Sequence, residues 1–357
     1  MAVDQQTSAY AAAGVDIEAG ERAVELMKAS VAATRRPEVL GSLGGFAGFF
    51  DAAALARYDH PVLATSTDGV GTKVAIAGAM GVYDTIGFDL IGMLVDDLVV
   101  CGAEPLFVTD YIACGRVHPE RIAAIVSGIA AACIEAGAAL LGGETAEHPG
   151  LLGVDDFDVA GATTGVVEKA KILGAERVRP GDVALALASS GLHSNGYSLV
   201  RQVLLNQAGW SLERHVDELG RSLGEELLQP TRVYAKPCLD VIAATQVHAM
   251  SHITGGGLAN NLARVLPDGI HVAIDRATWT PPPIFSLVQR VGAISQPDIE
   301  ATLNQGVGMV VLLPEQSVAV AQATLASHGV ASWVAGRATA AAGPGTVEVR
   351  GRHRDRE

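Results

Sequence analysis

The spacing of apolar residues predicts a helix near the start of the chain. Apolar side chains recur at helical intervals across residues 19–34, and Pro37 ends the pattern. Residues 1–20 are polar and alanine-rich, so we expect an arm there. The glycine-rich run GSLGGFAGFFD, which begins at Gly41, predicts a loop.

Strand-like and helix-like runs alternate from residue 61 onwards. In the first half we expect strands at 61–70, 104–115, 138–147 and 157–169, and helices at 84–101 and from His118-Pro119 onwards. This alternation predicts an α/β (α+β) fold class. The apolar stretch at 122–141 is interrupted by serine, glutamate and glycine, so it predicts a buried helix rather than a membrane span.

The segment GAERVRPG at 174–181 breaks the alternation, and we place a domain boundary there. Beyond it we expect strands at 182–191 and 306–314, a further strand from His248, and helices at 195–205 and 258–266. The chain therefore divides into an N-terminal domain at 1–173, a related C-terminal domain at 174–340 and a loose charged tail at 341–357.

Composition narrows the classes of function. Hydrophobic residues make up 49% of the 357 residues, which is enough for buried cores and argues against global disorder. The formal net charge of −14 argues against binding to nucleic acid or anionic membranes, which need clustered lysine and arginine. Binding of small anionic ligands is still compatible with this charge, because backbone N–H groups and carboxylate-bound metal ions can hold them.

The cysteines and the N-terminus indicate a cytoplasmic protein. The four cysteines show no CxxC spacing and no paired framework, so we expect reduced, mostly buried thiols. The first residues have neither a basic segment nor an apolar one, so no signal peptide is expected.

The segment STDGVGTK gathers phosphate-binding chemistry at the end of a predicted strand. Asp68 can hold Mg²⁺, the glycines let the backbone approach phosphate oxygens, and Lys73 can neutralise charge. The segment matches neither GxxxxGK[ST] nor GxGxxG, and taken alone such a turn is more often a plain turn.

Acidic residues stand beside apolar or glycine-rich runs at two further places. Asp96 and Asp97 point about 100° apart on the predicted helix at 84–101, so only one can be central to a site. A position on a solvent-exposed face of the helix explains either aspartate equally well. The pair Gly142-Gly143 is followed by Glu144 and Thr145, which places an acid next to flexible backbone.

The C-terminal half adds two glycine-bearing turns. The loop SSGLHSNG contains Ser190, His193, Ser194 and Asn195; a lone histidine is more often structural, but this position at the start of a helix suits a functional one. In the second turn, TGGG, Thr254 is a candidate N-cap, and residues 255–257 offer N–H groups to an anion.

His248 and His252 are four residues apart, but the segment predicts a strand, so we do not favour a zinc site. Together, the acids, the lysine and the glycine turns indicate Mg²⁺-dependent use of ATP on a phosphorylated substrate.

The motifs also resemble one family. GVDIEAG, TRRPEV, STDGVGTK, DLVVCGAEPLFVTDYIA, LLGGETAEHPG, SSGLHSNGYSLVR and HITGGG, in this order, are similar to the aminoimidazole ribonucleotide synthetases. The resemblance extends from about Tyr10 to about Gly336. STDGVGTK occurs across a wider ATP-using superfamily, whereas the run through DLVVCGAEPLFVTDYIA is much narrower.

The resemblance implies a homodimer of two-domain chains whose N-terminal domains pair through β-strands into a shared barrel. It implies ATP-dependent ring closure of formylglycinamidine ribonucleotide to 5-aminoimidazole ribonucleotide, with release of ADP and phosphate, in purine biosynthesis. ATP phosphorylates the formyl oxygen, and the amidine nitrogen then attacks that carbon. Mg²⁺ is implied as cofactor, and a requirement for a monovalent cation such as K⁺ stays open.

The resemblance also implies roles for residues. Asp68, Lys73 and His193 would be catalytic, with the role of His193 open between acid–base work and a phosphate contact. The implied Mg²⁺ ligands are Asp68, Asp97 and Glu144; the implied ATP contacts are Lys28, Gly69, Gly71, Thr72, Lys73, Gly142, Gly143, Glu144 and Thr145; the implied substrate contacts are Ser190, His193, Ser194, Asn195, Gly255, Gly256 and Gly257. Asp96 stands where many relatives have Asn, and we expect it to be a surface charge rather than an extra metal ligand.

Two alternatives stay open. One is another enzyme of the superfamily: formylglycinamidine synthetase, selenophosphate synthetase or thiamine-phosphate kinase. The chain shows no glutaminase nucleophile segment and no cysteine before Cys101, which disfavours the first two. The other is a non-catalytic nucleotide-binding dimer, which is disfavoured because the acids and the lysine are all present.

Overall fold

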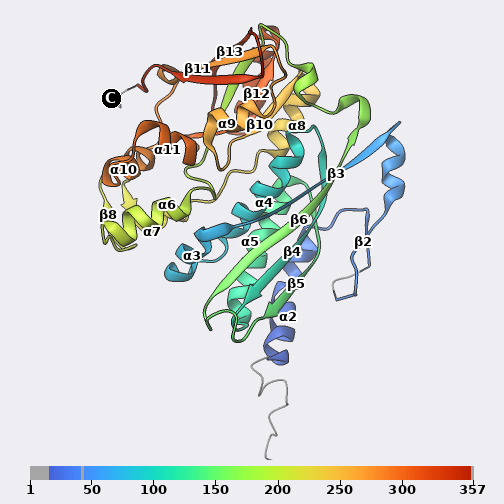
Figure 1. The fold of residues 1–357 in the computed structure, drawn as a ribbon. Helices are drawn as coiled ribbons and strands as arrows, with labels where there is room; N and C mark the ends of the chain where they lie inside the picture. The colour runs from blue at the N-terminus through green and yellow to red at the C-terminus, as the bar shows by residue number, and fades with distance from the viewer. Residues whose placement is uncertain (1–15, 42–43, 355–357) are drawn as a thin grey trace, which may run out of the picture.

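The N-terminal part of the protein is a four-stranded sheet with helices on one face (Figure 1). The computed structural model describes residues 16–41 and 44–354. The sheet order is β3 (Pro61–Gly69), β6 (Phe157–Glu168), β4 (Glu104–Cys114) and β5 (Ala139–Glu147). Strands β4 and β5 run parallel and the other pairs run antiparallel. The helices are α2 (Ile17–Ala33), α4 (Thr85–Val99) and α5 (Pro119–Ala136), and the short β1 (Val39–Leu40) pairs with β2 (Phe49–Phe50).

The C-terminal part is a six-stranded mixed sheet. Its order is β10 (Ala249–His252), β12 (Val307–Leu313), β7 (Val183–Ala188), β13 (Ser332–Ala340), β11 (Ile270–Asp275) and β14 (Thr346–Arg350). Two separate hydrophobic clusters lie on its two faces. The helices are α8 (Ala235–Ala244), α9 (Gly257–Ala263), α10 (Pro283–Val291), α11 (Gln296–Thr302) and α12 (Val318–Ser327).

Shorter elements lie between the main helices and strands. A 3₁₀ turn at Gly71–Lys73 leads into α3 (Val74–Met80), and the predicted helix at 195–205 is α6 (Tyr197–Arg201) continued by a π-helical turn (Gln202–Gln207). Other short elements are α7 (Leu223–Leu227), the pair β8 (His215–Val216) with β9 (Arg221–Ser222), and several 3₁₀ turns.

The largest hydrophobic core is shared by the two domains. It contains Leu90 and Ile125 from α4 and α5 together with Tyr197, Leu227 and Phe285 from beyond the predicted boundary. The boundary at 173/174 therefore marks a change of sheet, and not a gap in the packing.

Most elements expected from the sequence are present, and the α/β fold class is confirmed. Helix α5 begins after His118 with Pro119 at its first turn and ends at Gly137, whose φ of +79° suits glycine. The four cysteines are free, and three of them are buried. No helix among the described residues is long and apolar enough to cross a membrane.

Two expectations about the ends of the chain were wrong. Residues 17–20 belong to α2, which Asp16 caps by accepting a hydrogen bond from the Ala19 N–H; the rest of the expected arm lies outside the described residues. In the expected loose tail, Thr346–Arg350 is strand β14, which pairs in parallel with β11. Its alternating exposure shows why the composition of the tail concealed a strand.

Helices α4 and α5 cross at two glycines. A Cβ on Gly128 would overlap the Asp84 carbonyl, and one on Gly87 would overlap the backbone of residues 128 and 129.

We expect Gly128→Ala to lower the free energy of unfolding by about 1–3 kcal/mol, because the helices must separate. Gly20→Ala in α2 is the matched control, since nothing lies near its Cβ position. It should be neutral or stabilising by up to about 1 kcal/mol. Urea unfolding measures both, and equal effects would contradict close packing as the reason for Gly128.

Candidate functional site

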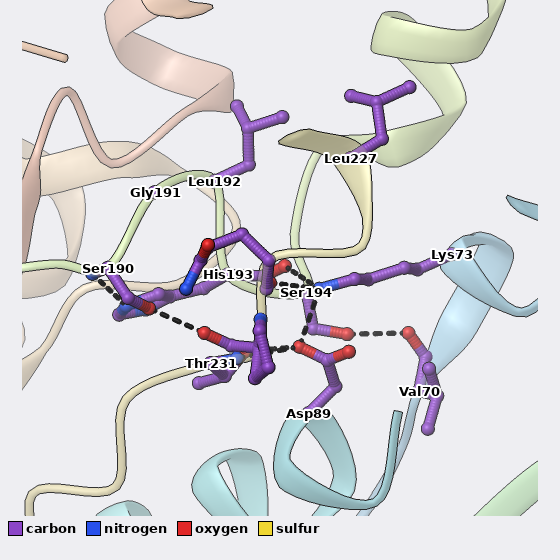
Figure 2. Close-up of polar contacts among 12 residues, drawn as sticks. Val70, Lys73, Asp89, Ser190, Gly191, Leu192, His193, Ser194, Leu227 and Thr231 are labelled. Atoms are coloured by element: carbon purple, nitrogen blue, oxygen red, sulfur yellow. Dashed lines mark hydrogen bonds and ion pairs between the residues drawn. The ribbon is translucent and has the colours of Figure 1, made fainter. Parts of the chain in front are cut away.

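A buried lysine joins the two domains (Figure 2). The Lys73 ammonium donates to Asp89 Oδ1 at 2.8 Å, to the His193 carbonyl at 3.1 Å and to the Gln229 carbonyl at 2.7 Å. The backbone N–H and the hydroxyl of Thr231 donate to the same Asp89 oxygen. Both charged side chains are fully buried. Burial lowers the pKa of Lys73 and raises that of Asp89, and the attraction between the two opposes both shifts.

This position differs from the predicted role of Lys73 as a phosphate ligand. The ammonium has three N–H groups, and protein oxygens accept from all three. Its neighbour Thr72 is exposed and lies 3.2 Å from the Ser198 hydroxyl. The structure therefore places Lys73 as a link between domains, and leaves the preceding backbone to meet a ligand.

The turn after Asp68 packs directly on the SSGLHSNG loop. The Ser194 hydroxyl donates to the Val70 carbonyl at 2.6 Å, and the Ser190 hydroxyl donates to the Pro230 carbonyl at 2.6 Å. These serines, which were expected to contact substrate, instead hold the loop in place. The two motifs therefore meet in the folded chain.

Helix α4 brings Asp97 to the C-terminal loops. Asp97 Oδ1 lies 3.0 Å from Nδ1 of His252, and Met93, one turn earlier, accepts from the Asn195 amide at 3.2 Å. A Cβ on Gly255 would lie 3.4 Å from Asn195 Oδ1. Asp97, Asn195 and the glycine turn thus line one junction.

Asp68 lies exposed at the end of edge strand β3, where its carboxylate accepts from the Gly69 N–H at 2.7 Å. Among the described residues, no three His, Cys, Asp or Glu side chains converge into a ready-made metal site. Mg²⁺ commonly uses one or two carboxylates together with water and substrate phosphates. The accessible carboxylates of Asp68 and Asp97 fit that kind of site.

Asp96 is buried, and the expectation of a surface charge was wrong. Its Oδ1 accepts from the Tyr234 N–H at 2.9 Å, and its Oδ2 is buried without a hydrogen-bond partner. Burial, followed by the charge of Asp97, raises its pKa well above the ordinary value. Burial therefore favours the protonated, uncharged form of this carboxyl.

His193 is also buried. Its φ of +62° follows from the sharp turn of the loop, and its Nε2 accepts from the Ser190 N–H at 3.2 Å. Burial, with a smaller contribution from His252, lowers its pKa well below the ordinary value, so the ring is neutral. This favours a structural or hydrogen-bonding role over exchange of protons with solvent.

The glycine turn is organised by a residue that the sequence analysis did not single out. The N-cap of α9 is Gly256 rather than the expected Thr254. The side-chain amide of Asn261 donates to the carbonyls of Thr254, Gly255 and Gly257. An Asn four residues into an expected helix carries no sign of this role, because its partners appear only when the turn folds back.

Glu144 lies away from Asp68 within one chain. The pairing register aligns Asp68, Gly161, Asp110 and Gly143 across the four strands. At about 4.8 Å between strands, β5 lies roughly 14 Å from β3. Glu144 therefore belongs to the opposite edge of the sheet.

Lys28 is at this second edge as well. Helix α2 packs on α5 and β5, and the exposed Lys28 ammonium forms an ion pair with Glu25. The residues implied for ATP binding therefore form two groups in a single chain.

Asp110 was missed by the sequence analysis. A Cβ on Gly143 would meet its carboxylate, and burial raises its pKa to about 7. Its negative charge adds to burial in raising the pKa of the Cys133 thiol on α5, which places the carboxyl between the sheet and that helix. The sequence does contain one indication of Asp110: an acidic residue at a position of the strand whose side chain faces the core.

The histidines weighed as a zinc pair have separate partners. Nδ1 of His248 lies 2.8 Å from Asp182 Oδ2, whereas His252 pairs with Asp97. The two imidazoles thus pair with different carboxylates on different elements.

We expect Lys73→Met to lower the free energy of unfolding by about 3–5 kcal/mol, because Asp89 would remain buried without its cation. Urea unfolding of the variant beside Thr72→Ser, which keeps an exposed hydroxyl, measures the effect. Unchanged stability together with lost ATP affinity would show instead that Lys73 is a phosphate ligand.

Asp110→Asn should be more stable than the parent above pH 5. Because the folded pKa of about 7 exceeds the ordinary value of 3.8, the folded state binds a proton that the unfolded state has released. The stability of the parent relative to the variant is highest below about pH 4 and falls by about 1.4 kcal/mol per pH unit until about pH 7. Unfolding measured from pH 4 to 8 checks this, and a constant difference would contradict the burial of this carboxyl.

Comparison with known proteins shows which sequences this chain is similar to. Residues 50–167 match the family model described as AIR synthase related protein, N-terminal domain, and residues 179–347 match the model for the C-terminal domain. The phosphoribosylformylglycinamidine cyclo-ligase of Geobacillus sp. (strain WCH70) is 50% identical over 92% of this chain and 95% of that protein. The enzyme of the same name from Brevibacillus brevis is 52% identical over 88% of this chain and 91% of that protein.

Solved structures share the fold. Thiamine-monophosphate kinase from Stenotrophomonas maltophilia K279a superposes with a TM-score of 0.66 at 18% identity, covering 93% of this chain and 97% of that one. The hydrogenase maturation protein HypE in complex with ATP has a TM-score of 0.60 at 19% identity, covering 94% and 93%. At these identities the likeness concerns the fold alone.

Proposed function

The chain belongs to the phosphoribosylformylglycinamidine cyclo-ligase family of ATP-dependent ligases, and from this premise we propose that its reaction takes place along the junction of the two domains. The observation that carries this proposal is the meeting of motifs distant in sequence. The turn after Asp68 contacts the 190–198 loop through Val70 and Ser194, and Asp97 contacts the strand that leads into the glycine turn.

The chemistry closes an imidazole ring on formylglycinamidine ribonucleotide. The formyl oxygen attacks the γ-phosphorus of ATP, and ADP leaves. The amidine nitrogen that carries the ribose then attacks the formyl carbon and loses its proton, and the C–O bond breaks with release of phosphate. Transfer of a proton from the ring methylene carbon to the exocyclic imine nitrogen completes the aromatic aminoimidazole ring. Phosphorylation is needed because an amide oxygen is a very poor leaving group.

Asp68 and Asp97 are the residues that would hold Mg²⁺. Both carboxylates are accessible, and Asp97 is 46% exposed although its Oδ1 is engaged by His252. The ion would neutralise phosphate charge when bound. The backbone of Gly69, Gly71 and Thr72 lies beside Asp68 and is suited to phosphate oxygens.

We propose that the ribose phosphate of the substrate meets the turn at residues 255–257. Asn261 fixes the carbonyls of this turn, and Asn195 lies beside Gly255. Because His193, Ser190 and Ser194 are used to hold their loop, Asn195 is the side chain of that loop best placed for substrate.

We also propose that the protein acts as a homodimer. Leu63 and Tyr111 are 60% and 41% exposed on the sheet face that no labelled helix covers (Figure 1). Closing two such sheets into a barrel about a two-fold axis pairs β3 of one chain with β5 of the other, which removes all four open edges. This arrangement would bring the partner's Glu144 to the Asp68 edge, and it accounts for the two separated groups of implied ATP ligands.

The test is the complete reaction with purified protein, Mg²⁺-ATP and formylglycinamidine ribonucleotide. We expect equimolar ADP and aminoimidazole ribonucleotide. Asp68→Asn and Asp97→Asn should each lower kcat/KM by at least about 100-fold, because each removes a charge facing the phosphates. Asp217→Asn, at a fully exposed carboxylate of the C-terminal domain, is the matched control and should be unchanged.

Other outcomes identify the alternatives. ADP formed without the imidazole product would indicate another substrate of the superfamily. ATP binding without ADP formation would favour a non-catalytic dimer. Full activity of both Asp variants would contradict the proposed location of the site.

A further inference from the structure

His252 reaches from the C-terminal sheet to Asp97 in the other domain. It is the last residue of β10, an edge strand, and its side chain is 3% exposed whereas that of Asp97 is 46% exposed. Its Nδ1 lies 3.0 Å from Asp97 Oδ1. The contact therefore fixes Oδ1 of Asp97 against the buried His252 ring. The rest of the Asp97 carboxylate remains accessible to a ligand.

The hydrogen-bond partners fix the tautomers of two histidine rings. An ionised carboxylate can only accept, so His252 carries its proton on Nδ1 and its Nε2 is an acceptor when the ring is neutral. A backbone N–H can only donate, so Nε2 of His193 is an acceptor and Nδ1 carries the proton. Nδ1 of His193 and Nε2 of His252 are both buried without a partner. One is a donor and the other an acceptor, which makes them complementary.

Both histidines lie at the start of β12. His252 pairs with Met309 on β12, and Ile253 bonds to the adjacent Gly308. A Cβ on Gly308 would lie 2.7 Å from Cε1 of His193, so this ring occupies the space above that glycine. His252 also lies close enough to contribute to the lowered pKa of His193, after burial.

We propose that His193 and His252, joined by one buried water molecule, form a hydrogen-bonded relay that runs from the Ser190 N–H to Asp97 and orients its carboxylate. In this relay Nδ1–H of His193 donates to the water, the water donates to Nε2 of His252, and Nδ1–H of His252 donates to Asp97 Oδ1. A buried polar site with unpartnered groups is where a water is commonly held. His252 is thus a positioning residue, comparable to the outer groups that orient metal ligands.

The inference rests on the proposed role of Asp97, but its first test does not need the reaction. Nitrogen-15 NMR of the histidine-labelled protein without nucleotide should show both rings in the Nδ1–H form, with His193 and His252 assigned through single variants. In His252→Asn the Nδ1 resonance of His193 should shift, because its partner is lost. Either ring in the Nε2–H form, or an unshifted His193, would overturn the relay even if the protein is a fully active cyclo-ligase.

The second test distinguishes orientation of Asp97 by the Nδ1–H of His252 from a general stabilising role of His252. The amide of His252→Asn can place an N–H close to the position of Nδ1, whereas His252→Gln places it nearer that of Nε2. We expect the Asn variant to bind Mn²⁺ in the presence of ADP within about threefold of the parent. The Gln and Ala variants should bind it at least about tenfold more weakly. Electron paramagnetic resonance measures this binding without turnover.

The steady-state reaction should show the same order, with the KM for Mg²⁺ raised in the Gln and Ala variants more than kcat is lowered. Equal Mn²⁺ binding by the Asn and Gln variants would show that orientation of Asp97 does not depend on Nδ1–H. If the parent itself makes no product while the NMR result holds, the proposed function fails and the relay stands.

Discussion

The burial of one ammonium group is the constraint on which the rest of the structure depends. Removing a charge from water costs several kcal/mol unless partners replace the lost hydration. Lys73 meets this condition only when three segments are assembled: α4 through Asp89, and two C-terminal loops through the carbonyls of His193 and Gln229. The pair therefore stabilises one relative position of the domains, because any displacement leaves a buried charge without its partners.

The shared hydrophobic core has the same consequence. Leu90 and Ile125 of the N-terminal helices pack in one cluster with Tyr197 and Phe285 of the C-terminal part. Two sheets with separate strand orders thus behave as one packed unit around the junction. The proposed site needs this rigidity, because the proposed metal ligand Asp97 and the glycine turn beside Asn195 belong to different domains.

Burial also distinguishes several polar residues near the proposed site from the exposed ones. Asp96, Asp89 and His193 sit within hydrogen-bonding distance of loops that present the exposed groups. Burial raises the pKa of Asp96 and lowers the pKa of His193, so it favours the uncharged form of each. Asp97, only one residue from Asp96 on the helix, faces the solvent-accessible junction instead, since successive helical side chains diverge by about 100°.

The fold class, most strands and helices, the family and the motifs of the junction could be predicted from the amino-acid sequence. These are local properties, since apolar periodicity, glycine turns and Pro119 at a helix start act over a few residues. The sequence also indicated that only one of Asp96 and Asp97 could be central. Four features became visible only in the folded chain: which acid is buried, the enclosure of Lys73, the pairing of β14 with the sheet, and the position of Glu144 and Lys28 at the opposite edge of the sheet from Asp68. Each of these depends on partners from distant parts of the chain, as in the pairing of Asp97 with His252, and no local pattern encodes such partners.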